Sequence, residues 1–152
     1  MKRSDEIRVI IADDDKYWIE FLEQYLIMCG VLVVGVTTNG TEQIEMIKKL
    51  EADIIITDIE RKNGISGLEV IKKCKEINIP SKFLITTAGL TPEKLIELHN
   101  MGIYNILFKP FKLKELLELI KRSRLEELKE IMMREKCENK RKNKILFRKN
   151  KI

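Results

Sequence analysis

The sequence predicts an α/β fold, a doubly wound, five-stranded parallel sheet with helices on both faces and an extended C-terminal helix. Short runs rich in Val and Ile alternate with longer segments of helical period along the chain. Each short run is almost continuously apolar, which is typical of strands that are covered on both faces. Five such strand–helix units fit into about 120 residues, as a doubly wound sheet requires.

The five predicted strands are the β-branched runs at 7–12, 31–37, 53–57, 82–87 and 104–108. The segments between them, 16–29, 41–51, 67–78 and 92–101, have the apolar spacing of helices. Residues that commonly start a helix precede three of them. These are Asn39, Ser66 and Thr91, the last followed by Pro92 at a first helical position.

The fifth helix begins near Leu113 and continues beyond the length that the sheet needs. Its apolar stripe first fits packing on the sheet and then extends for about three further turns. The residues of this stripe are Leu116, Leu117, Ile120, Leu125, Leu128, Ile131 and Met132. We therefore divide the chain into a domain at 1–124, a helix extension at 125–135 and a basic tail at 136–152. The tail loses the apolar period, which favours disorder.

Composition limits the classes of function. No apolar run approaches the roughly 18 residues of a membrane span, and the N-terminus turns acidic before any apolar stretch. Three widely spaced cysteines without a CxxC pair indicate reduced thiols and a cytoplasmic protein. The net charge of +5 is uneven, because the nine Lys/Arg and two Glu of residues 134–152 leave residues 1–133 slightly acidic.

Polar residues follow four of the predicted strands. Asp13, Asp14 and Asp15 end the first strand, Asp58 the third, Thr87 the fourth and Lys109 the fifth. Ligands of parallel α/β sheets bind outside the carboxyl ends of the strands, so these side chains are expected at one edge. Carboxylates that crowd together suit Mg²⁺, which takes oxygen ligands and keeps several waters.

Taken alone, the acidic run also fits helix capping. Asp15 is better explained as the N-cap or first-turn acid of the first helix than as a metal ligand. For Asp13 and Asp14 the metal site is favoured, since Asp58 and Lys109 fall on the same edge.

The order of these motifs resembles a response-regulator receiver domain of the stand-alone type. The shared features are the acidic pair, the lone Asp, Thr87-Ala88 and the stretch "NILFKPFKLKELLELI", over roughly residues 7–124. The resemblance implies a flavodoxin-like sheet of order 2-1-3-4-5. It also implies a two-component signalling phosphoprotein rather than a metabolic enzyme, one that catalyses only its own phosphorylation and dephosphorylation.

The resemblance also assigns roles to residues. Asp58 becomes the phosphoacceptor, which forms an aspartyl-phosphate, and Thr87 and Lys109 contact the phosphoryl oxygens. Asp13, Asp14, Asp58 and the backbone carbonyl of Glu60 become ligands of Mg²⁺. A cis Lys109-Pro110 bond is expected to aim the lysine into the site.

Two departures from the family pattern stand out. The loop after Asp58 reads IERKNGISG, so that Lys62 takes the place of the usual proline and Gly67 arrives one residue late. An acid at Glu60 is expected to alter the lifetime of the phosphorylated state. Ile106 stands where receivers carry the aromatic ring that moves during switching.

The main functional hypothesis is a response regulator phosphorylated by a sensor histidine kinase or a phosphotransfer protein. Its output is expected through contacts with a downstream protein, and a phosphorylation-dependent homodimer through the helix extension is weakly supported.

Two alternatives belong to other classes. A nucleic-acid-associated regulator would use the basic tail, with binding that weakens steeply as salt rises. A haloacid-dehalogenase-type phosphohydrolase is a remote alternative, because no acidic pair follows a strand after Lys109.

Overall fold

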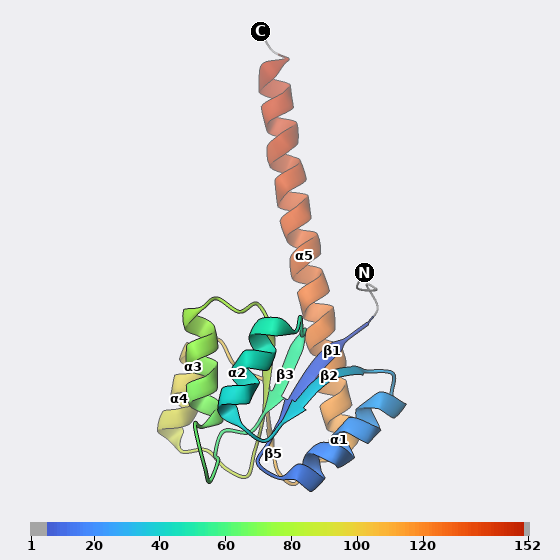
Figure 1. Cartoon of the computed structure of the whole chain (residues 1–152). Coiled ribbons are helices and arrows are strands. Elements are labelled where there is room, and N and C mark those ends of the chain that lie inside the picture. The colour runs from blue at the N-terminus through green and yellow to red at the C-terminus, as the bar shows by residue number, and fades with distance from the viewer. Residues whose placement is uncertain (1–5, 151–152) are drawn as a thin grey trace. The chain divides into compact units, whose positions relative to one another are not determined.

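The computed structural model describes residues 6–150 and confirms the predicted α/β architecture (Figure 1). The strands and helices alternate strictly along the chain. The elements are β1 (Arg8–Ala12), α1 (Lys16–Met28), β2 (Leu32–Thr37), α2 (Gly40–Lys49), β3 (Ile54–Thr57), α3 (Gly67–Glu76), β4 (Lys82–Thr87), α4 (Pro92–Asn100), β5 (Ile106–Phe108) and α5 (Leu113–Lys149). Each predicted element is present; β5 is two residues shorter at its start than the predicted 104–108.

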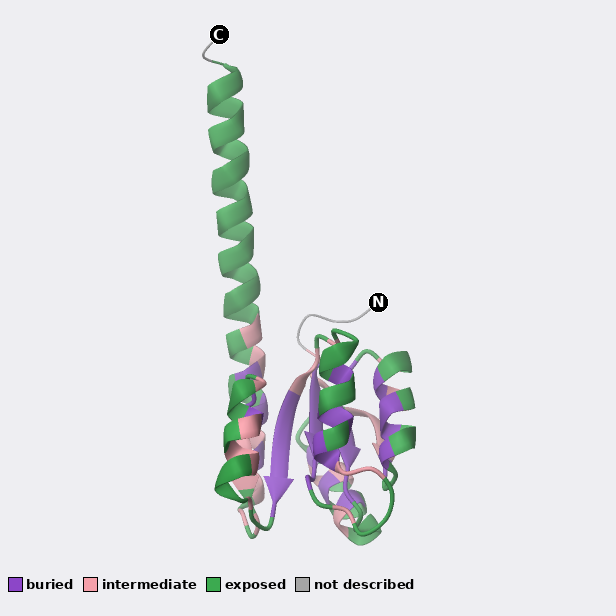
Figure 2. Cartoon of the chain, turned by 90° about the vertical axis from the view of Figure 1, so that its left-hand side faces the viewer, coloured by how far each residue is buried: buried purple, intermediate pink, exposed green. Residues whose placement is uncertain are grey.

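The five strands form one parallel sheet of order β2-β1-β3-β4-β5, as the resemblance implies. Its two faces carry separate apolar cores, because side chains alternate along each strand. Ile10 and Ile55 face the core that α2, α3 and α4 cover, whereas Ile11 and Ile56 face the core that α1 and the start of α5 cover. The strand β3 is buried throughout, and β1 and β4 are buried except at their first residue, whereas the edge strands β2 and β5 are only partly buried (Figure 2).

The predicted start signals work as caps. Asn39, Ser66 and Thr91 each accept a hydrogen bond from a backbone N–H in the first turn of α2, α3 and α4. Asp15 caps α1 in the same way through Tyr17 and Trp18. The capping interpretation of Asp15 is therefore confirmed.

The chain divides into two compact units, Met1–Ile120 and Lys121–Ile152. The boundary falls within α5, a few residues before the predicted boundary at 124. In the second unit the helix continues to Lys149, whereas the sequence predicts disorder for residues 136–152. Strong helix formers and the absence of Gly and Pro after residue 112 keep the backbone helical, although the apolar period is lost. Residues 151 and 152 lie outside the described residues.

Within the part of the chain that the structure describes, no helix is long and apolar enough to cross a lipid bilayer.

Candidate functional site

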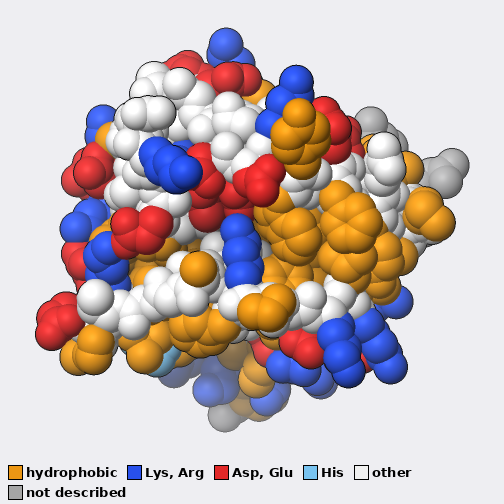
Figure 3. Space-filling view, turned by 90° about the horizontal axis from the view of Figure 1, so that it is seen from below, with side chains coloured by type: hydrophobic (Ala, Val, Ile, Leu, Met, Phe, Trp, Pro, Cys, Tyr) orange, Lys and Arg blue, Asp and Glu red, His pale blue; other side chains and the backbone are white. Residues whose placement is uncertain are grey.

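The carboxyl ends of the strands gather the predicted acidic side chains. Among residues 6–150, Asp13, Asp14 and Asp58 offer carboxylate oxygens that all lie within 4.8 Å of one another. Asp13 and Asp58 are buried and Asp14 is exposed. Figure 3, which views this end of the molecule, shows acidic side chains next to a basic one, bordered by a patch of hydrophobic side chains. The sequence prediction that the first and third strands deliver one acidic cluster is confirmed.

A pocket of about 180 Å³ opens beside the acidic cluster. Of the predicted site residues, Asp13 does not line it; its lining comes from all four loops and consists of Asp14, Asp58, Glu60, Thr86, Thr87, Ala88, Gly89 and Lys109. Both Thr86 and Thr87 line it. The Thr87 hydroxyl donates a hydrogen bond of 2.9 Å to the carbonyl of Gly89, so that it is held within its own loop.

Lys109 neutralises one of the acids. Its Nζ lies 2.7 Å from Oδ2 of Asp13 and 5.7 Å from the centroid of the Trp18 ring. The Lys109-Pro110 peptide bond is cis, as expected. The Asp13 side chain is only 3% exposed, so the lysine supplies a charge that this buried carboxylate needs.

Asp58 lies at the centre of the site, and the pKa of its carboxyl is raised above the ordinary value. Burial raises the pKa of its carboxyl to about 6, and the Asp13 charge adds to this rise. Arg61 and the backbone N–H of Asp14 act in the opposite direction, since both stabilise the charged carboxylate. Perturbed carboxyls of this kind in a pocket are frequent at functional sites.

Sequence reasoning missed Arg61. Its Nε donates to Oδ1 of Asp58 at 2.8 Å, and its side chain is fully buried. The Nη2 atom donates to Gln43 and Thr57 on the protein interior. Arg61 and Lys62 are adjacent basic residues in one loop, and no periodicity distinguishes the buried one from the exposed one.

The altered loop after Asp58 still closes on β3. The backbone N–H of Gly67 donates to the carbonyl of Ile59 at 2.9 Å. A Cβ atom at Gly67 would lie 1.7 Å from the carbonyl oxygen of Asp58, so only glycine fits this approach. The extra residue is absorbed before Gly67, where Gly64 adopts a positive φ of 79°.

The two positions that depart from the family pattern, Glu60 and Ile106, each contact neighbouring elements. The Glu60 carboxylate forms an ion pair with Lys94 of α4. Ile106 is partly buried against the core that α2, α3 and α4 cover. Tyr104 is 70% exposed and its ring contacts that of His99.

The donor set fits a divalent cation. Three carboxylates on one edge, two of them buried, match the oxygen ligands that Mg²⁺ prefers. Two of these carboxylates are paired with Lys109 and Arg61. An ion that binds here must share them with these resident cations.

Comparison with known proteins places this geometry in a family. The model of the response regulator receiver domain matches residues 9–121. The chemotaxis protein CheY of Thermotoga maritima is 29% identical over 113 residues, which cover 74% of this chain and 93% of that protein. A probable transcriptional regulator ycf29 of Porphyra purpurea is 35% identical over 117 residues; the match covers 74% of this chain but only 54% of that regulator.

A solved structure agrees with the sequence comparison. The CheY-like receiver domain protein of Methanospirillum hungatei JF-1 superposes with a TM-score of 0.76 at 25% identity, over 83% of this chain and 99% of that one. The family match, the sheet order and the acidic pocket lead to the same conclusion. The chain belongs to the response regulator receiver domain family.

Proposed function

We propose that Asp58 is the phosphoacceptor of this receiver domain and that it takes its phosphoryl group from a sensor histidine kinase or a phosphotransfer protein. The observation that carries the proposal is the position of Asp58, which joins the acidic cluster and also lines the 180 Å³ pocket. A carboxylate in this place can attack phosphorus while the phosphoryl oxygens occupy the pocket.

The attack is a simple displacement. An oxygen of the Asp58 carboxylate forms a bond to phosphorus, the bond to the donor group breaks, and the donor leaves with that electron pair. The product is an acyl phosphate, the mixed anhydride of the Asp58 carboxyl group and phosphate. Such transfers need mainly positioning and neutralisation of charge on the phosphoryl oxygens.

The residues of the pocket supply these needs. Asp13, Asp14, Asp58 and the Glu60 carbonyl would hold Mg²⁺, which neutralises phosphoryl charge when bound. Lys109 can move from Asp13 to a phosphoryl oxygen, because it is a point charge on a flexible stem. Thr87 would donate to another phosphoryl oxygen after leaving Gly89.

The output is proposed to pass through contacts with a downstream protein, in the cytoplasm. The free state of Cys29, Cys74 and Cys137 supports this location.

The test is phosphorylation of the full chain by acetyl phosphate with Mg²⁺, followed by intact mass measurement. We expect one added phosphoryl group on the wild type and none on Asp58→Asn. Omission of Mg²⁺ should also prevent the addition. An unmodified wild type would contradict the proposal.

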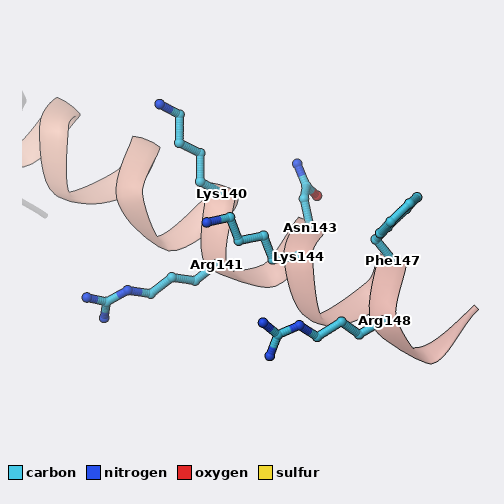
Figure 4. A pocket seen from close by; sticks show the side chains of 6 residues that line it. All are labelled: Lys140, Arg141, Asn143, Lys144, Phe147 and Arg148. Atoms are coloured by element: carbon cyan, nitrogen blue, oxygen red, sulfur yellow. The ribbon is translucent and has the colours of Figure 1, made fainter. Parts of the chain in front are cut away.

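A second candidate output is binding of nucleic acid through the end of α5. Lys140, Lys144 and Arg148 follow one another at intervals of four, so they share a face of the helix. Figure 4 shows these side chains, with Arg141, Asn143 and Phe147, projecting from a single helix without an opposite wall. A basic helix face suits contacts to phosphates, and a single ring gives little support for stacking on bases.

Salt titration of a gel shift tests this output. Binding to a DNA or RNA duplex should weaken steeply between low and physiological salt and should disappear when 134–152 are deleted. A shift that survives this deletion would exclude the tail from the interaction.

A further inference from the structure

Arg61 is a buried cation of the site that does not line the pocket. The pocket is lined by Asp14, Asp58, Glu60, Lys109 and residues 86–89, and Arg61 is not among these residues. Arg61 instead contacts Asp58 from the interior, with 0% of its side chain exposed. It therefore cannot be a direct ligand of a phosphoryl group in the pocket.

The guanidinium of Arg61 is fixed from two directions. Nε donates to Asp58, and Nη2 donates to Oε1 of Gln43 at 2.5 Å and to Oγ1 of Thr57 at 3.1 Å. Gln43 is itself fully buried, and its amide donates to the same Thr57 hydroxyl. A planar guanidinium held by two other acceptors loses little further freedom when it binds a carboxylate.

The third nitrogen of the guanidinium, Nη1, is buried without a hydrogen-bond partner. A Cβ atom at Gly40 would lie 2.9 Å from it, so the start of α2 leaves room for this group only because residue 40 is glycine. Burying an unpartnered N–H costs free energy. The contact with Asp58 offsets this cost. Unlike a surface ion pair, this pair is buried on both sides.

Both oxygens of Asp58 are engaged in this arrangement. Oδ1 accepts from Arg61, and Oδ2 accepts from the backbone N–H of Asp14 at 3.2 Å. A divalent cation at the acidic cluster draws on the same carboxylate as Arg61 does. Two positive charges within reach of one buried carboxylate repel each other strongly.

We propose that Arg61 is an internal counter-ion of Asp58, a positioning residue that holds the acceptor carboxylate when no cation is bound and lowers the affinity of the site for Mg²⁺. This inference rests on the proposed Mg²⁺-dependent function of Asp58 and adds a residue that sets the ion concentration at which that function begins.

The test is the Mg²⁺ affinity of the full chain, measured by calorimetry and by the fluorescence of Trp18, the only tryptophan. Removing the competing charge in Arg61→Met should lower the Mg²⁺ dissociation constant about tenfold, the size of one charge-assisted hydrogen bond. Arg61→Lys keeps the charge and should stay closer to the wild type than Arg61→Met.

Two further variants separate this effect from general causes. Lys62→Met removes the same charge from the neighbouring exposed position and should leave the Mg²⁺ affinity within about twofold of wild type, because exposed charges are screened. Gln43→Leu loosens the guanidinium without changing any charge and should raise the affinity by less than Arg61→Met does. It also replaces Arg61→Met as the decisive variant if the latter does not fold.

Equal Mg²⁺ affinity in wild type, Arg61→Met and Gln43→Leu would overturn the inference. The same outcome together with a phosphoryl group on wild-type Asp58 would leave the proposed function standing. The absence of both Mg²⁺ binding and a phosphoryl adduct in the wild type would overturn the two together.

Discussion

The surroundings of Asp58 shift the pKa of its carboxyl in opposite directions. Burial and the Asp13 charge favour the protonated carboxyl, whereas Arg61 and the Asp14 N–H favour the carboxylate. The result, a pKa of about 6, leaves the group mostly charged at neutral pH, as the proposed attack on phosphorus requires. The same residue becomes protonated in mild acid.

The raised pKa predicts a dependence of stability on pH in the absence of divalent cations. The folded state holds the proton of Asp58 up to about pH 6, and the unfolded state releases it near the ordinary value of 3.8. The stabilising contribution of Asp58 is thus complete below this ordinary value and is lost as the pH rises to about 6.

Urea unfolding in chelator measures this contribution as the difference in free energy of unfolding between wild type and Asp58→Asn. As the pH rises from about 4 to about 6, the free energy of unfolding of the wild type should fall relative to that of Asp58→Asn. Above about pH 6 the difference should stay constant. A difference that does not change over this range would contradict the raised pKa.

Glu60 predicts an effect on the lifetime of the phosphorylated state. Its carboxylate lies at the pocket, where it can accept a proton from attacking water, and Lys94 restrains it by an ion pair. Glu60→Ala should lengthen the lifetime of the acyl phosphate by at least about threefold, and Lys94→Ala should shorten it. The measurement is loss of the phosphoryl adduct over time.

A matched control for this prediction is Glu93→Ala, which removes an exposed acid next to Lys94 outside the pocket. Its lifetime should equal that of the wild type. Equal lifetimes in all four proteins would show that Glu60 has no part in the hydrolysis.

At the scale of elements, the loop between β3 and α3 decides the geometry of the site. It carries Glu60 and Arg61 and returns to Asp58 through Gly67. Gly67→Ala should lower the free energy of unfolding by at least about 2 kcal/mol, because its Cβ would overlap the backbone carbonyl of Asp58.

Gly89→Ala is the control for this substitution. A Cβ at Gly89 has no neighbour within 4 Å and its φ is not positive, so thermal or urea unfolding should be nearly unchanged. If the two variants unfold alike, the close approach of Gly67 does not constrain the loop.

These elements also show how far the sequence determines the fold. Short, almost continuously apolar runs identify every strand of the sheet domain and period-3.6 patterns identify its helices, and the caps at Asn39, Ser66 and Thr91 lie where predicted. The acids of the first and third strands meet because parallel strands end on one edge. The inward course of Arg61 could not be predicted, because it depends on Gln43 and on the space at Gly40, which are distant in sequence.

At the end of α5 the structure has a helix where the sequence favours disorder. The expectation of disorder rested on the loss of an apolar stripe, which reports packing rather than backbone preference. Lys, Arg, Glu and Leu are good helix formers, and a helix without a core contact is still their favoured local conformation. Every residue of this helix from 128 to 149 is exposed (Figure 2).

For the whole molecule, this exposure predicts that the sheet domain does not depend on the tail. Deletion of 134–152 should change the free energy of unfolding of the sheet domain by less than about 0.5 kcal/mol, as for surface changes in general. It should also change the net charge from +5 to −2, since the nine Lys/Arg and two Glu of this segment carry a net charge of +7. A large loss of stability on deletion would contradict the separation of the two units.

The central claim is that the carboxylate of Asp58 is the acceptor, rather than either of its acidic neighbours. Borohydride reduces an acyl phosphate of aspartate to homoserine, which peptide mass spectrometry can locate in the chain. After treatment with acetyl phosphate and Mg²⁺, the account predicts homoserine at position 58 and unmodified aspartate at positions 13 and 14. Homoserine at position 13 or 14, with Asp58 intact, would contradict it.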